Sequence, residues 1–351
     1  MHLLFYWADS RVKVTCEVKL DNQKNMVEIM DIDKLIYYAT LAPSGHNTQP
    51  WKFSVDNNVV RMYPDFDRTL PVVDEDNHAL YISLGCALEN LVISAKHEGL
   101  KSSVDYFPSD ENEECIRITL NGETNQSEQE LFETIPIRQS NRSMYNQKEI
   151  PSADIEQLLQ ASELNTITIK TFNTKENNVE PIIELVKEAC KIQFNDRQFV
   201  EELISWIRFT KKEVQTKKDG LTAKVMGFPY IPRWLGRIIL KIFVKPKNEA
   251  EKAEKQIRSS SNLFLFISKR NDKLHWVETG RVFQRTVLTA TSLGIVHAHM
   301  NMPCEVESVR KKMSDHLGLN PHERPMLLIR LGYAAEVARS PRRSPEEVLM
   351  N

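Results

Sequence analysis

The feature that most constrains the fold is a pair of long apolar segments that repeat each other 195 residues apart. Residues 75–99 and 272–294 both carry apolar side chains at helical spacing, and the first segment is too apolar for a surface helix. With Leu80–Gly85 set over His275–Gly280, the two stretches stay in register without a gap. The coincident residues include Ala95 with Ala290, Gly99 with Gly294, Leu100 with Ile295 and Pro108 with Pro303.

This repeat has two interpretations. Two amphipathic helices can resemble each other by chance, and a weaker similarity sets Asp31–Ile36 against Asp154–Leu159. A helix, a terminating glycine and a following strand at identical spacing favour an internal duplication instead. The two long helices would then pack against each other at a pseudo-two-fold centre, as in a homodimer whose interface has become internal.

Strand patterns are distributed through the chain between helices. Residues 52–55 and 59–63 flank Asp56–Asn58 and predict a hairpin, and further strands are expected near 103–107, 115–120, 263–268 and 326–331. Helices are expected in 174–218, 249–259 and 304–316. The alternation predicts an α+β fold with central mixed β-sheets flanked by helices.

Composition limits the classes of partner. The 41% hydrophobic and 27% charged residues are typical of a soluble globular protein, and the net charge of -2 disfavours binding of nucleic acid through a broad basic field. The five cysteines, two of them in apolar contexts and expected to be buried, lack disulfide or metal spacing. Met1–Trp7 lacks the basic lead of a signal peptide, and no run reaches the ~18 apolar residues of a membrane helix. We therefore expect a cytoplasmic protein.

A dense polar corner, Ala42–Trp51, separates a predicted helix from a predicted strand. Its two prolines fix the direction of the chain, and the residues between them offer small or polar groups and free backbone N–H groups. One interpretation is an ordinary polar loop. The other, which we favour, is a binding site for a flat polar ligand.

Two basic motifs could bind an anion. Arg138 and Arg142 are four residues apart with Ser140 between them, which on a helical turn would put both guanidinium groups on one side, where they could bind a phosphate. The alternative is a solvated turn that pairs with Glu133 or Glu149. Arg342 and Arg343 near residue 351 read, by themselves, as a solvated tail.

Other motifs narrow the chemistry. His297 and His299 alternate on a predicted strand with no third ligand nearby, which disfavours zinc. The sequence has no Gly-x-Gly-x-x-Gly after a strand, no Walker-type loop and no Gly-x-Ser-x-Gly elbow. With 11 glycines, a glycine-rich dinucleotide fold is disfavoured.

Residues 220–246 are aromatic, interrupted by Pro and Gly, and then sharply apolar over Ile238–Val244. Three interpretations remain open, namely an ordinary buried helix, an amphipathic helix on a membrane surface, and a lid over a ligand site. A membrane partner is disfavoured, and we favour the lid.

The corner resembles the corner signature of the nitroreductase family of flavin proteins. The longer pattern, over approximately residues 31–349, resembles the Acg-like subgroup, in which one chain takes the place of the usual dimer. The resemblance implies that FMN is the cofactor and that its phosphate is held by Arg138, Ser140, Arg142 and one of Arg342 and Arg343. It also implies that Pro43, Ser44, Gly45 and Asn47 reach the flavin from the other half, and that the turn Met300, Asn301 and Met302, matched by position only, lies beside the reactive edge of the ring.

The same resemblance implies the organisation and the activity. An extension, 1–30, would precede a first half, 31–136, and a second half, 137–351, which contains a lid at about 220–246. One full site is expected, because each half lacks the motif that the other carries. The flavin would carry electrons from NAD(P)H to a nitro, quinone or similar small acceptor, with no catalytic side chain and no metal. The alternative is a lidded FMN store with little reductase activity. Association of two such chains is also compatible with the sequence.

Overall fold

The computed structural model describes residues 31–350 apart from 109–114, 126 and 163. The fold is that of the compact unit Asp33–Asn351, and the other unit, Met1–Ile32, contains the predicted extension. The extension and Cys16 lie outside the described residues. The other four cysteines are unpaired and buried, as expected of small apolar side chains.

The first half builds one four-stranded sheet in the order β1-β2-β4-β3, antiparallel throughout. Its strands are β1 Trp51–Asp56, β2 Val59–Pro64, β3 Leu100–Tyr106 and β4 Ile116–Glu123. The predicted hairpin is confirmed, with Asn57 in the left-handed conformation at its turn (φ 53°). Helix α1, Ile32–Thr40, precedes β1, helix α2, His78–His97, joins β2 to β3, and α3, Gln129–Thr134, follows β4.

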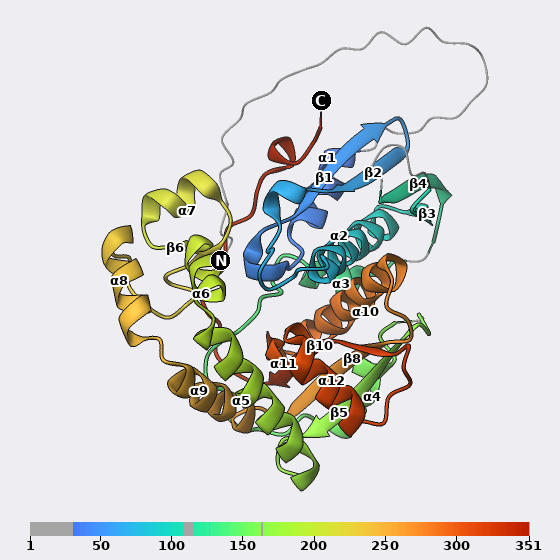
Figure 1. Cartoon of the computed structure of the whole chain (residues 1–351). Coiled ribbons are helices and arrows are strands. Elements are labelled where there is room, and N and C mark those ends of the chain that lie inside the picture. Colours follow the sequence, from blue (N-terminus) through green and yellow to red (C-terminus); the bar gives the residue numbers. More distant parts are fainter. Residues whose placement is uncertain (1–30, 109–114, 126, 163, 351) are drawn as a thin grey trace, which may run out of the picture. The chain divides into compact units, whose positions relative to one another are not determined.

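The second half builds another four-stranded antiparallel sheet in the order β5-β8-β10-β9. Its strands are β5 Ile167–Asn173, β8 Asn262–Ser268, β9 Val296–His299 and β10 Arg324–Gly332. Helix α4, Ser152–Leu159, precedes β5, and α10, Lys273–Ser292, joins β8 to β9 (Figure 1). The helix predicted over 304–316 is two helices, α11 Met302–Glu305 and α12 Glu307–His316, because Val306 between them is extended (φ −81°, ψ 108°).

The two halves use the same plan. In each, a helix precedes the first strand, a long helix joins the second strand to the third, and the strand order is first, second, fourth, third. The glycines predicted to end the long helices, Gly99 and Gly294, both have positive φ, 77° and 70°. These are the properties that an internal duplication requires, and the duplication itself stays a prediction.

Helices α2 and α10 pack against each other through two glycines. A Cβ on Gly85 would lie 1.9 Å from the carbonyl oxygen of Val277, and one on Gly280 would lie 2.0 Å from that of Ile82. Both pairs are related by the 195-residue offset, so the contact has the symmetry expected of a pseudo-two-fold centre. Only glycine allows the two backbones to approach this closely.

The expectation of mixed sheets needs correction. Both four-stranded sheets are antiparallel, and parallel pairing within the described residues occurs between the short strands β6, Ile207–Arg208, and β7, Leu221–Thr222. It also occurs at two isolated bridges, Phe53 with Leu349 and Ser140 with His297. The bridges matter because they come from distant segments. The chain after β10 returns to pair beside β1, and the chain before β5 pairs beside β9.

The segment between the first two strands of the sheet is long only in the second half, where it joins β5 to β8. It contains α5 Glu180–Asn195, α6 Arg197–Ser205, β6 Ile207–Arg208, α7 Lys211–Lys217, β7 Leu221–Thr222, α8 Arg233–Phe243 and α9 Pro246–Arg258. Helices α5 and α9 pack on the second sheet through a buried apolar cluster that includes Val186 and Ile257. Helix α8 is not an ordinary buried helix, because only its Gly236 is buried.

One described helix is long and apolar enough by composition to cross a membrane. It is α2, which is almost wholly buried inside the fold.

Candidate functional site

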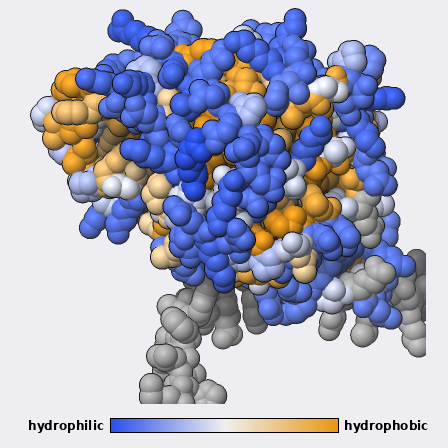
Figure 2. Space-filling model, turned by 90° about the horizontal axis from the view of Figure 1, so that it is seen from below, coloured by the Kyte–Doolittle hydropathy of each residue, from blue (hydrophilic) through white to orange (hydrophobic). Residues whose placement is uncertain are grey.

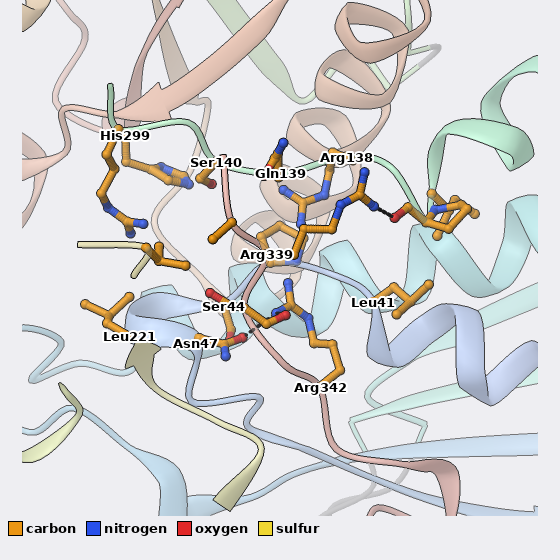
Figure 3. Close-up of a pocket in the computed structure, with 17 residues that line it drawn as sticks. Leu41, Ser44, Asn47, Arg138, Gln139, Ser140, Leu221, His299, Arg339 and Arg342 are labelled. Atoms are coloured by element: carbon orange, nitrogen blue, oxygen red, sulfur yellow. Dashed lines mark hydrogen bonds between the residues drawn. The ribbon is translucent and has the colours of Figure 1, made fainter. Parts of the chain in front are cut away.

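Five chain segments meet around a cavity of about 160 Å³ that opens to solvent (Figure 3). The lining residues are Leu41, Pro43, Ser44 and Asn47 of the corner, Ile135, Pro136, Arg138, Gln139, Ser140 and Arg142 before β5, Leu221 and Val225 of the long insertion, His299 at the end of β9, and Ala338, Arg339, Ser340 and Arg342 after β10.

The corner is held in an unusual backbone conformation. His46, Asn47 and Gln49 have φ values of 45°, 56° and 54°, a region that non-glycine residues seldom adopt. The Ser44 hydroxyl stabilises the turn by accepting a hydrogen bond from the Gln49 backbone N–H (2.9 Å). The corner is therefore a fixed structure, and it is not an ordinary loop.

Asn47 joins three segments of the cavity wall. Its side-chain amide donates to the carbonyl oxygens of Gly220 (3.1 Å) and Pro341 (3.2 Å), and its oxygen accepts a hydrogen bond from Arg342 (2.8 Å). The backbone N–H of Gly220 also donates to the Asn47 carbonyl (3.1 Å). Asn47 is consequently buried and its side chain fully satisfied.

The helical turn predicted for 138–142 is wrong. These residues are extended, and Ser140 pairs in parallel with His297 beside β9. Arg138, Ser140 and Arg142 nevertheless all line the cavity, as does Gln139 between them. Neither Glu133 nor Glu149 forms a recorded ion pair with the motif, and Glu149 pairs with Lys175.

The segment after β10 is not a solvated tail. Arg342 lines the cavity and donates to Asn47, whereas Arg343 points elsewhere and bonds the carbonyl oxygens of Gln49 (3.2 Å) and Glu347. Arg343 also lies 3.6 Å from Asp65. One of Arg342 and Arg343 was expected to contact the phosphate, and of the two it is Arg342 that lies at the cavity.

The cavity wall is strongly cationic. Four of its side chains are arginines, and none of the described lining residues is acidic. Arg138 is buried, and its Nε and one terminal nitrogen lack hydrogen-bond partners among the described residues, as does Nε of Arg342. Burial, together with the charge of Arg339, lowers the pKa of Arg138 to about 10, and burial together with the charge of Arg138 lowers the pKa of Arg342 to about 9. Both stay charged at neutral pH, so their burial is unfavourable until an anion pairs with them.

Three neutral imidazoles lie near Arg142. Burial, together with the charge of Arg142, lowers the pKa of His46 and of His299 to about 4. Burial likewise lowers the pKa of His297, whose Nε2 has no hydrogen-bond partner among the described residues. The positive charge of this neighbourhood therefore comes from Arg142 and Arg138, and the imidazoles are uncharged at pH 7.

Besides Arg343, four other predicted residues do not line the cavity. Gly45 belongs to the same corner but packs against Leu70. Met300 is buried in the core of the second half, and its backbone N–H already donates to the carbonyl oxygen of Leu328 (2.8 Å). Met302 packs against that same core, and the Asn301 side chain bonds the Leu328 N–H and Glu305. The wall on this side is His299, one residue earlier.

Arg339, His299, Leu221 and Val225 line the cavity without having been proposed for it. The strand that ends at His299 could have indicated that residue, because the last side chain of a strand reaches the sheet edge. Arg339 carries no signal beyond its position beside Ser340–Pro345. Leu221 and Val225 lie within the segment interpreted as a lid, but nothing in their spacing distinguishes them.

The chain is similar along most of its length to known proteins. It is 22% identical over 311 residues to Rv3131 of Mycobacterium tuberculosis (strain H37Rv), provisionally named an NAD(P)H nitroreductase, with 84% of this chain and 83% of that protein covered. It is 29% identical over 84 residues to Acg of the same organism, which has the same provisional name, with 24% and 25% covered. No family model matches the sequence.

Solved structures resemble the chain more distantly. An FMN-dependent nitroreductase, NfnB from Mycobacterium smegmatis in complex with NADPH, is 13% identical and has a TM-score of 0.41, with 62% of this chain and 96% of that chain covered. A nitroreductase from Bacteroides fragilis with bound FMN is 18% identical and has a TM-score of 0.35, with 61% and 92% covered.

Proposed function

We propose, from the premise that this chain is a nitroreductase-family protein with Acg-like relatives, that it binds one FMN in the arginine-lined cavity and is an FMN-dependent oxidoreductase. Its reductant would be NAD(P)H, and its acceptor a nitro, quinone or similar small molecule. The halves 31–136 and 137–351 would each supply part of the one site, the first the corner and the second the arginines.

One observation carries the proposal. Buried Arg138 has unpartnered guanidinium nitrogens, and it lies in a wall that contains three other arginines and no acidic residue among the described lining. A guanidinium donates two parallel hydrogen bonds to a phosphate, and a dianionic phosphate would offset the repulsion between neighbouring arginines. The chemistry of the donor set therefore fits the phosphate of FMN.

The chain's own residues would bind, orient and shield the cofactor. The phosphate would be held by Arg138, Arg339 and Arg342. These guanidinium groups are close enough that the charge of Arg339 lowers the pKa of Arg138, and the charge of Arg138 lowers the pKa of Arg342. Arg142, near His299, would place a positive charge farther along the cavity, where an electron-rich ring is stabilised. FMN supplies the hydride and electron chemistry when bound. The neutral imidazoles of His46 and His299 would not compete with Arg142 for negative charge.

A second candidate function rests on Leu221 and Val225. These residues bring the insertion into the cavity wall, and Asn47 anchors the insertion beside them at Gly220. If this wall keeps reductants and acceptors from the ring, the protein stores FMN and turns over little. Anaerobic addition of NADPH separates the two functions, because rapid bleaching of the flavin band indicates an enzyme and a persistent band indicates a store.

The binding proposal is tested by comparing FMN with riboflavin, which lacks the phosphate. We expect Arg138→Gln and Arg342→Gln to weaken FMN binding by about 100-fold, equivalent to two charge-assisted hydrogen bonds, and to change riboflavin binding little. Arg343→Gln is the matched control, since Arg343 contacts Asp65 and Gln49 outside the cavity.

The affinities are measured by quenching of flavin fluorescence with purified, folded variants. If Arg343→Gln weakens FMN binding as much as Arg342→Gln, the assignment of the phosphate to this cavity fails. Purified protein that takes up no flavin from excess FMN would end the proposal altogether.

A further inference from the structure

Helix α8 shows an apolar face to solvent. Trp234, Ile238, Ile242 and Phe243 have 65%, 46%, 59% and 69% of their surface exposed, and Ile239 has 36%. Trp234 and Phe243 are the most exposed of the large apolar residues in the described chain. Figure 2 shows apolar surface at its left edge, the side on which α8 lies in Figure 1. A patch of this kind is usually covered by something when the protein works.

The opposite side of α8 is anchored. Arg233 pairs with Glu213 (2.8 Å), Arg237 with Glu201 (3.2 Å), and Lys241 also contacts Glu201. Gly236 packs on the Phe209 ring so closely that a Cβ would lie 2.2 Å from it. Helix α8 is therefore fixed to α6, α7 and β6 with its apolar face outward, and none of its residues lines the cavity.

The surroundings of α8 are strongly positive. Residues 206–247 contain eleven Lys and Arg but two Asp and Glu, a formal charge of +9 in a chain whose net charge is -2. Among the exposed cations of this segment, Lys241 pairs with Glu201 and Lys247 lies 3.9 Å from Glu251, whereas Lys211, Lys212, Lys217, Lys224 and Lys245 form no ion pair with the described residues. A short helix with Trp, Ile and Phe outward and cations around it has the composition of helices that lie in the surface of a bilayer.

We propose that the apolar face of α8 docks this protein on the surface of an anionic lipid bilayer. Trp234, Ile238, Ile242 and Phe243 would enter the boundary between headgroups and acyl chains, while the surrounding lysines attract the anionic headgroups. At 11 residues, α8 is too short to cross a membrane, so it lies in the surface. The proposal is independent of FMN binding.

Charge disfavours the other occupants. A second copy docked face to face would bring two segments of charge +9 together, and the repulsion opposes such a dimer. A nucleic acid would satisfy the lysines but would leave the aliphatic side chains of Ile238 and Ile242 in water. An anionic bilayer accommodates both the charge and the apolar face.

The test is sedimentation of the full chain with vesicles of phosphatidylcholine and phosphatidylglycerol, compared with phosphatidylcholine alone. We expect binding to the anionic vesicles that weakens at high salt, and binding to the neutral vesicles that is about tenfold weaker or less. The double variant Ile242→Ser, Phe243→Ser should lower anionic vesicle binding at least about tenfold. Phe66→Ser, which removes a side chain of 46% exposure elsewhere, is the matched control and should bind as wild type.

Circular dichroism and thermal unfolding establish that the variants are folded, which is expected because the changed side chains are exposed. The proposal is overturned if wild type does not sediment with anionic vesicles, or if the double variant sediments as well as wild type does. It is also overturned if light scattering shows that wild type is a dimer and the double variant a monomer. A third contrary result is that a short DNA duplex binds wild type as tightly as the vesicles do and binds the double variant equally well.

Discussion

Asn47 and Arg342, which are 295 residues apart in the chain, are joined by a hydrogen bond of 2.8 Å from the guanidinium to the side-chain oxygen. The same asparagine donates to Gly220 and Pro341. The corner, the insertion and the segment after β10 therefore share one residue, and the cavity wall depends on it.

Replacing Asn47 tests this dependence. We expect Asn47→Gly to keep the left-handed backbone (φ 56°) while removing three hydrogen bonds, which lowers the free energy of unfolding by about 1–3 kcal/mol and weakens FMN binding. Asn47→Ala should lose about 1 kcal/mol more, because alanine is strained at this φ. Urea denaturation of both variants measures the two effects. Equal stability of Asn47→Gly and wild type would mean that the bonds to Gly220, Pro341 and Arg342 are not stabilising.

The helix contact at the centre of the fold predicts a second result. Gly85→Ala or Gly280→Ala should cost more than about 3 kcal/mol or prevent folding, because the added methyl group would overlap a backbone carbonyl that cannot move aside. Gly122→Ala is the control, since its Cβ meets no atom within 4 Å and only its φ of 62° is strained, at about 1 kcal/mol. Thermal unfolding compares them, and a control that is as damaging as Gly85→Ala would contradict the packing argument.

The pH dependence of stability reports on the corner. The pKa of His46 is lowered from 6.5 to about 4 by burial and by Arg142, so the unfolded chain binds the proton more readily between these values. Stability should be level above pH 7 and should fall as the pH drops from 6.5 towards 4, by at most about 1.4 kcal/mol per pH unit from this residue. His46→Asn, which tolerates the left-handed backbone, should have a shallower slope. His299 contributes with the same sign, so part of the slope remains.

Inorganic phosphate should stabilise the flavin-free protein. An anion that binds the folded cavity raises the free energy of unfolding by mass action, about 2.7 kcal/mol at 100 times its Kd. We expect the thermal midpoint to rise with phosphate in wild type and much less in Arg138→Gln, because Arg138 holds unpartnered donors in the cavity. The comparison is made at constant ionic strength, so that screening does not imitate binding. An equal rise in both proteins would place the anion elsewhere.

The sequence predicted most of the elements because their signals are local. Hydrophobic period and terminal glycines located α2 and α10, and the turn Asp56–Asn58 located the first hairpin. The split of the 304–316 helix at Val306 was missed, because a single extended residue carries no distinctive composition. The mixed sheets were also wrong, since the direction of strand pairing depends on contacts between distant segments.

The sequence predicted several residues that line the cavity but not the geometry of their segments. Arg138, Ser140, Arg142 and Arg342 line the cavity, but the motif is extended where a helical turn was expected, and the pairing of Ser140 with His297 that makes it so spans the second half. Met300 does not line the cavity for a similar reason. Its backbone N–H donates to the carbonyl oxygen of Leu328, which belongs to a neighbouring strand. Spacing alone does not reveal these long-range hydrogen bonds.

The order in which the wall is synthesised follows from the path of the chain. The corner emerges from the ribosome early, and Arg339 and Arg342 emerge after every other segment that lines the cavity. A chain that ends before residue 339 would lack two of the four guanidinium groups of the wall. We therefore expect a chain truncated there to purify without flavin.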